Sequence, residues 1–163
     1  MNYCQPKIEK RESIKCKLSV DGSVKEYLVN FRNIHEVSTE SRDYYSIISI
    51  ISQDFYHFLK SKSIYDCKLR KKIVYYINIF IYNYLTAHHK KDLTYYKSGI
   101  IEDFLMNWYP CNYPSAPALF ISEMTGFILY FYEYLLSLNW IEAVSYEKAR
   151  AEVSEIGERY RSI

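Results

Sequence analysis

Apolar side chains recur at intervals of three and four residues through much of the chain, and this period predicts amphipathic helices. One stripe covers residues 40–61 and a second covers residues 64–88. Ser63 with Asp66 resembles a capping box at the start of the second helix. Apolar residues also lie on the opposite side of that helix, so we expect other helices to surround it. The stripes consist of Tyr44, Ile47, Ile48, Ile51, Phe55, Phe58 and Leu59, and of Leu69, Ile73, Tyr76, Ile77, Phe80, Tyr84 and Leu85.

A proline-rich stretch separates the next two helices. The pattern predicts a short helix over residues 98–109, which Pro110 and Pro114 should end because proline lacks an N–H donor and restricts the residue before it. Pro117 suits the first turn of the following helix. We interpret the stretch as a rigid corner with Cys111, Asn112 and Tyr113 on its surface, rather than as an active loop. The following stripe consists of Phe120, Met124, Phe127, Ile128, Phe131, Leu135 and Leu138.

The two ends of the chain follow different patterns. Residues 14–31 alternate between apolar and polar around Asp21-Gly22, which predicts a β-hairpin with a type I′ turn. From Ser145 a thin apolar stripe runs through a highly charged helix, a pattern that favours association with a second copy or another protein. The residues predicted for that partner surface are Tyr146, Val153, Ile156 and Tyr160.

These elements predict a mainly α fold, a helical bundle of about five helices with an N-terminal β-hairpin. We expect one domain over residues 1–163, since no linker is long enough to divide it. Its parts are a hairpin region at 1–37, a helical core at 38–141 and a charged C-terminal helix at 142–163.

Composition adds limits rather than an activity. The chain is 49% hydrophobic and 25% charged with a net charge of +2, far from the strongly basic balance that by itself indicates nucleic-acid binding. The 19 tyrosines, with many Ile, Lys and Asn residues, favour AT-rich codons and hence a low-GC bacterium, its phage or a large DNA virus. The longest apolar run, Ile73–Leu85, has 13 residues, too few to span a bilayer. Without an apolar leader at the start, we expect a cytoplasmic protein with no membrane partner.

Basic residues concentrate at the turn between the first two helices. Such a cluster next to tyrosines is compatible with contacts to a phosphate backbone, although a solvated helix turn is the ordinary explanation. The residues of this basic cluster are Lys60, Lys62, Lys68, Arg70, Lys71 and Lys72.

The motifs of several enzyme classes are absent from the sequence. There is no G-x-S-x-G, no glycine-rich phosphate loop, no H-E-x-x-H and no C-x-x-C. His88-His89 ends the second helix, where cationic side chains complement the helix dipole, so we interpret the pair as a cap rather than a metal site. Glu102 and Asp103 fit the first turn of their helix in the same way. We expect no catalytic residue, metal or cofactor.

Residues 100–141 nevertheless resemble a segment of small, uncharacterised, all-helical bacterial proteins that read F-L-x-x-W/Y-x-P before an aromatic helix. The matching positions here are Phe104, Leu105, Trp108, Pro110, Phe131, Tyr134 and Leu135. The resemblance implies a helical fold and no activity. The helical texture is also similar to the core-binding domain of tyrosine recombinases, whose catalytic H-x-x-R does not occur here.

We therefore expect a protein–protein interaction, adaptor or regulatory module, with a protein partner or a homodimer. The alternative is a nucleic-acid-binding module that uses the basic cluster. An enzyme whose site is assembled from distant residues also stays open, and an approach of His57, His88 or Asp92 to Cys111 would favour it.

Overall fold

The computed structural model describes residues 42–115 and 120–161, apart from the side chains of Asp43 and Arg161. Within these ranges the chain is mainly helical, as predicted, and forms five helices when contiguous segments are joined. The predicted N-terminal hairpin lies outside the described residues. No helix in the described ranges is both long and apolar enough to cross a membrane.

Helix α3 (Arg42–Ser61) confirms the first predicted stripe. Ile48, Ile51, Phe55 and Leu59 are at most 1% exposed, because they share the face that meets α4 and α7. The turn that follows corrects one detail of the prediction: Ser63 has a positive φ of 63° and occupies the turn itself.

Helix α4 (Cys67–Asn78) is capped by Asp66 instead, whose carboxylate accepts a hydrogen bond from the Lys68 N–H at 2.9 Å. The helix continues without a break into a π-helical segment, η2 (Ile79–His88). Its side chains are buried on several sides, as expected for a helix surrounded by others. π-Helical backbone is uncommon and is frequently found at functional sites, so the end of η2 is a candidate functional region.

The third helix passes through the predicted proline stop. It consists of α5 (Ile100–Asp103), the π-helical segment η3 (Phe104–Trp108) and α6 (Tyr109–Asn112). Pro110 lies inside α6, and Tyr109 before it keeps helical angles of φ −65° and ψ −49°. In a regular α-helix the proline ring meets the carbonyl four residues earlier. We attribute the tolerance to η3, whose wider turns change the carbonyl register just before Pro110.

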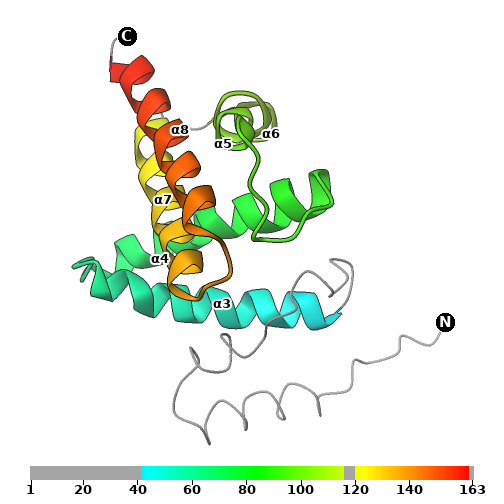
Figure 1. Cartoon of the computed structure of the whole chain (residues 1–163), viewed down its shortest axis with the longest axis vertical. Coiled ribbons are helices and arrows are strands. Elements are labelled where there is room, and N and C mark those ends of the chain that lie inside the picture. The colour runs from blue at the N-terminus through cyan, green and yellow to red at the C-terminus, as the bar shows by residue number, and fades with distance from the viewer. Residues whose placement is uncertain (1–41, 116–119, 162–163) are drawn as a thin grey trace, which may run out of the picture.

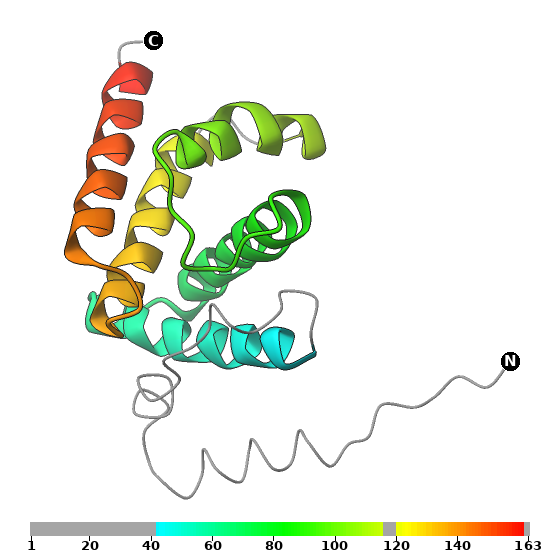
Figure 2. The same ribbon diagram turned by 45° about the vertical axis from the view of Figure 1, so that its right-hand side comes forward.

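Helices α7 (Phe120–Ser137) and α8 (Ala143–Arg161) form an antiparallel hairpin (Figures 1 and 2). The stripe predicted for α7 is confirmed, because all seven of its residues are at most 8% exposed. Helix α7 lies at the centre of the bundle, against α3, α4 and α8. Aromatic rings fill the space, as where Phe55 meets Phe131 edge to face with centroids 5.6 Å apart. Phe104, Leu105 and Phe120 are buried as well, so both sides of the proline-rich corner belong to this core.

Candidate functional site

The predicted basic cluster lies at the end of α3, in the turn and on α4, but half of it is engaged within the chain. Lys62 forms an ion pair with Glu133 of α7, and Lys72 forms one with Glu123 at 2.6 Å. Arg70 places its guanidinium 4.5 Å from the centre of the Tyr56 ring. Arg70 and Lys72 therefore attach α4 to its neighbours, Lys62 attaches the preceding turn to α7, and the charges of the two lysines are balanced by carboxylates.

The other cations of the cluster, Lys60, Lys68 and Lys71, are exposed. Large side chains are exposed beside them: Tyr65 at 69%, Leu69 at 37% and Tyr75 at 61%. Residues 68, 71 and 75 are three and four apart, so they lie on one side of α4. We call these three residues, together with Tyr65 just before α4 and Leu69 beside Lys68, the α4 face.

The predicted partner stripe of α8 is turned towards its own chain. Ile156 is 1% exposed, and the Tyr160 hydroxyl lies 2.8 Å from the Met106 sulfur of η3. Tyr146 and Val153 are half-buried against the same core. A partner surface at these four residues stays a prediction, but in this structure Ile156 is not accessible to a partner.

One buried acid on α8 was not anticipated from the sequence. Glu152 is 9% exposed, and one of its carboxylate oxygens accepts hydrogen bonds from the backbone N–H groups of Ile101 and Glu102, each at 2.9 Å. Its other oxygen accepts a bond from the Tyr96 hydroxyl at 2.8 Å. A carboxylate thus satisfies N–H groups of the first turn of α5 from another helix, and it fixes α8 against α5.

The structure also assembles a second group of polar side chains that are distant in the sequence. The Tyr84 hydroxyl of η2 donates to the Asp103 carboxylate at 2.6 Å, and the Asn107 amide donates to the other oxygen of that carboxylate at 3.0 Å. The His89 Nε2 atom lies 3.9 Å from Asp103, beyond hydrogen-bond distance. The His88 ring lies beside that of His89, with centroids 4.7 Å apart.

The environment sets the charges of this group. The hydrogen bonds from Tyr84 and Asn107 hold the pKa of Asp103 below its usual range, so the carboxylate is ionised at neutral pH. Burial, with the Asp103 charge, raises the pKa of Tyr84, which keeps its proton. Burial and the neighbouring His88 lower the pKa of His89, which is neutral at pH 7. Asp103 and Tyr84 therefore form a stable donor–acceptor pair and provide no activated nucleophile.

No hydrogen bond joins a thiol to a histidine candidate among the described residues. Cys67 and Cys111 are exposed free thiols, and Cys111 makes no hydrogen bond to His57 or His88 in the described part of the chain. His57 lies on α3 beside the Tyr56 ring, whereas His88 lies beside Tyr84. Among the described residues, no group of three or more His, Cys, Asp or Glu side chains could hold a metal ion.

The rest of the proline-rich corner is tied to the bundle. Tyr113 stacks on Tyr109 with centroids 4.7 Å apart and accepts a hydrogen bond from the Asn83 amide at 3.1 Å. The Asn112 amide donates to the Trp108 carbonyl at 2.7 Å. These contacts fit the structural corner that we infer from the sequence.

In comparisons with known proteins, no protein-family model, curated protein or solved structure matches the chain. The resemblance of residues 100–141 to uncharacterised helical bacterial proteins stays a prediction.

Proposed function

We propose that this protein works by binding another protein, and that the α4 face is the contact surface for an acidic patch of the partner. The observation that carries the proposal is the joint exposure of Tyr65, Leu69 and Tyr75 in one short segment, at 69%, 37% and 61%. Tyrosine is enriched at protein interfaces because its ring offers a large contact area and its hydroxyl a hydrogen bond.

Charge supports an acidic partner. Lys68 and Lys71 flank the exposed rings, and Lys60 is exposed at the end of α3. Cations around an apolar centre match the polar rim of an interface, where they guide the approach of a partner of opposite charge. Lys72 is paired with Glu123, so a carboxylate lies beside the face. Lys62 is likewise paired with Glu133, and nucleic-acid binding relies on cations that neutralise many phosphates, so the engagement of these cations within the chain favours a protein partner over a nucleic acid.

The test compares variants in capture and then in direct binding. The immobilised protein is exposed to a lysate of its own cell, beside the double variant Leu69→Ser/Tyr75→Ala. Val144→Ser serves as the matched control, because Val144 is an apolar side chain that is 60% exposed on α8. The captured protein is then purified and its Kd measured. We expect the double variant to bind at least about tenfold more weakly, since interface tyrosines are among the residues that dominate binding energy.

Two results would overturn the proposal. In one, the purified partner binds the double variant as tightly as the wild type. In the other, Val144→Ser weakens binding as much as the double variant. Charge is tested separately with Lys68→Glu/Lys71→Glu, which we expect to slow association mainly at low salt.

A nucleic acid is the second candidate, because exposed lysines beside exposed tyrosine rings also suit a phosphate backbone with stacked bases. A fluorescently labelled single-stranded DNA and its RNA equivalent are titrated at low salt. Binding that weakens steeply with salt, and that is lost in Lys68→Glu/Lys71→Glu, would replace the protein partner with a nucleic acid. No change in anisotropy at low salt would exclude this candidate.

A further inference from the structure

The end of η2 meets α5 and η3 in a cluster of five side chains, which we call the η2 joint: Tyr84, His88, His89, Asp103 and Trp108. The Tyr84 ring lies at the centre, with its centroid 4.6 Å from that of His89, 5.9 Å from that of His88 and 5.4 Å from that of Trp108. Trp108 is the contribution of η3 and carries no charge. The joint shares no residue with the α4 face, so its behaviour does not depend on the proposed function.

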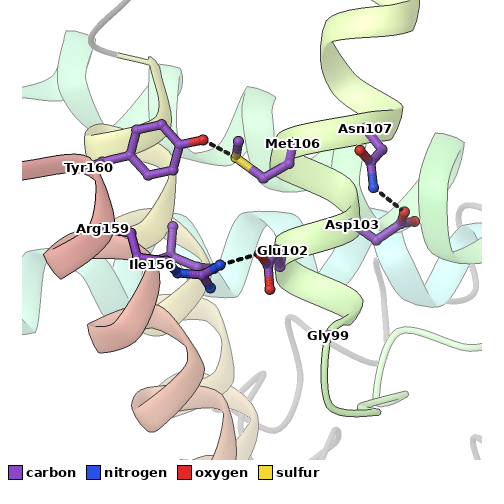
Figure 3. Close-up of a pocket in the computed structure, with 8 residues that line it drawn as sticks. All are labelled: Gly99, Glu102, Asp103, Met106, Asn107, Ile156, Arg159 and Tyr160. Atoms are coloured by element: carbon purple, nitrogen blue, oxygen red, sulfur yellow. Dashed lines mark hydrogen bonds and ion pairs between the residues drawn. The ribbon is translucent and has the colours of Figure 1, made fainter. Parts of the chain in front are cut away.

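The Asp103 carboxylate belongs to this joint rather than to the neighbouring pocket between α5 and α8. Figure 3 shows that it is turned away from Glu102 and Arg159 and is bonded to Asn107. Tyr84 donates to one of its oxygens at 2.6 Å, and the Asn107 amide donates to the other at 3.0 Å. Each oxygen of the carboxylate is therefore already engaged by a neutral donor.

His89 places a buried ring nitrogen in the joint without a bond. Its Nε2 atom is inaccessible to solvent and has no hydrogen-bond partner among the described residues. The Asp103 oxygen that faces it is 3.9 Å away, beyond hydrogen-bond distance. The side chain as a whole is 31% exposed, so the ring can exchange a proton with solvent. A buried nitrogen without an acceptor is tolerated in a neutral ring, but a charged N–H at the same place is penalised by desolvation.

The groups around the ring oppose its protonation in sum. Burial, with the nearby His88 and Lys91, lowers the pKa of His89 below its ordinary value of 6.5, although the Asp103 charge acts in the opposite direction. Tyr84 keeps its proton and adds no charge. Because the pKa is lower in the folded protein, the packing of neutral His89 contributes its stability in full above pH 6.5. That contribution is lost as the pH falls through the folded value.

The backbone at the end of η2 allows a local opening. Lys90 has a φ of 55°, in the left-handed region, and ends the helix there. The last backbone bonds run from the His89 N–H to the Tyr84 carbonyl at 3.0 Å and from the Lys91 N–H to the Leu85 carbonyl at 2.9 Å. Helix ends open at a lower free energy than the core of a protein. The amide protons of His89 and Lys91 therefore report whether this end is closed.

We propose that the η2 joint is a pH-sensitive contact, in which His89 takes up a proton in mildly acidic solution and the end of η2 then separates from Asp103 and Trp108. The imidazolium carries an N–H at Nε2 that has no acceptor in the closed joint, whereas water solvates it in the open one. The proton comes from solvent, and the charge of Asp103 does not change. Tyr84 is fully buried and stays in the core, so the opening is confined to the residues after it.

The test follows amide hydrogen exchange in the ¹⁵N-labelled full chain near pH 7 and near pH 5.5, as protection factors that correct for the intrinsic effect of pH on exchange. We expect the protection of the His89 and Lys91 amides to fall by about threefold to tenfold in acid. The upper limit is about tenfold because a free imidazole with a pKa near 6.5 is mostly protonated near pH 5.5. The Tyr113 amide, which donates to the Tyr109 carbonyl at 2.8 Å, should keep its protection.

Two matched variants assign the effect to one histidine. His89→Gln removes the titrating ring, whereas His57→Gln makes the same change on α3, at an exposed residue outside the joint. We expect the fall in protection to disappear in His89→Gln and to persist in His57→Gln. An NMR titration of the His89 ring in the unmodified chain should give a pKa below 6.5.

Several results would overturn the proposal. A pKa of His89 above 6.5 would show that Asp103 binds the imidazolium and that acid tightens the joint. Unchanged protection of the His89 and Lys91 amides, an equal fall at Tyr113, or a fall that persists in His89→Gln would each contradict it as well. The titration and the exchange of the unmodified chain decide the matter if the variant does not fold.

Discussion

The basic cluster of residues 60–72 and Glu152 of α8 are both charged features, but they differ in how the chain uses them. The cluster is conspicuous in the sequence, and half of it is engaged by neighbouring side chains while the rest is exposed. Glu152 is one acid among many on a charged helix, yet it is 9% exposed and accepts three hydrogen bonds. The density of charge along a sequence therefore says little about which charges hold the fold and which are available for a partner.

The contrast has a physical origin. Neighbouring lysines repel one another and stay hydrated, so most of a local cluster remains at the surface. A buried carboxylate is stable only where donors converge on it, and the donors to Glu152 come from residues about 50 positions earlier. We therefore expect substitutions to have large effects on folding at Glu152 and small ones at the α4 face.

The largest effect is expected for Glu152→Ala. The change leaves two backbone N–H groups of α5 and the Tyr96 hydroxyl without their acceptor in a buried place. We expect a loss of about 3 kcal/mol in the free energy of unfolding, measured with urea. Glu155→Ala, an exposed acid on the same helix, should change stability little. Equal losses in the two variants would show that Glu152 does not fix α8 to α5.

A smaller effect is expected for Tyr84→Phe, which removes the hydroxyl that donates to Asp103 at 2.6 Å. We expect a loss of about 1 to 2 kcal/mol at pH 7, with Tyr45→Phe at an exposed position as the control. The pKa of Asp103 should rise, as measured by NMR titration of its carboxyl group.

The stabilisation by the hydrogen bond between Tyr84 and Asp103 should depend on pH in a defined direction. The pKa of Asp103 is lowered in the folded protein, so its contribution is present above the unfolded value, near 3.8, and is lost as the pH falls through the folded value. The difference in the free energy of unfolding between the wild type and Tyr84→Phe should therefore become smaller as the pH is lowered. A constant difference down to the lowest pH at which the protein folds would contradict the assigned bond.

The smallest effect on folding is expected at the α4 face. Leu69→Ser/Tyr75→Ala alters side chains that are 37% and 61% exposed, and surface changes usually stay within about 0.5 kcal/mol. A urea midpoint close to that of the wild type is the expected result. A loss comparable to that of Glu152→Ala would mean that these residues belong to the fold, and the α4 face would no longer be a candidate surface.

Much of the fold was predictable because it depends on the spacing of apolar residues along the chain. Apolar side chains spaced by three and four residues lie on one side of a helix, and in a bundle that side packs against other helices. The stripes of α3 and α7 are therefore buried as expected. The local rules at helix ends were less reliable. Pro110 does not end its helix, because the π-helical segment η3 precedes it, and Asp66 rather than Ser63 caps α4.

The site residues were harder to predict, because their contacts join distant parts of the chain. Tyr84 and Asp103 are 19 positions apart, and no motif marks them as partners. The thin stripe of α8 suggested a partner surface, but Ile156 is buried against the protein's own core. One signal was available for the α4 face: Leu69 lies within the segment 60–72 that contains the basic cluster, and Tyr75 follows it. The spacing placed Leu69 in the apolar stripe, however, and the exposure of both side chains needed the structure.

The most direct test of the α4 face is the Kd of the purified protein partner for the wild type, Leu69→Ser/Tyr75→Ala and Val144→Ser, with unfolding curves for all three. We predict binding at least about tenfold weaker for the double variant alone, with the three unfolding midpoints nearly equal. Unchanged affinity in a folded double variant would contradict the claim that the α4 face binds the partner.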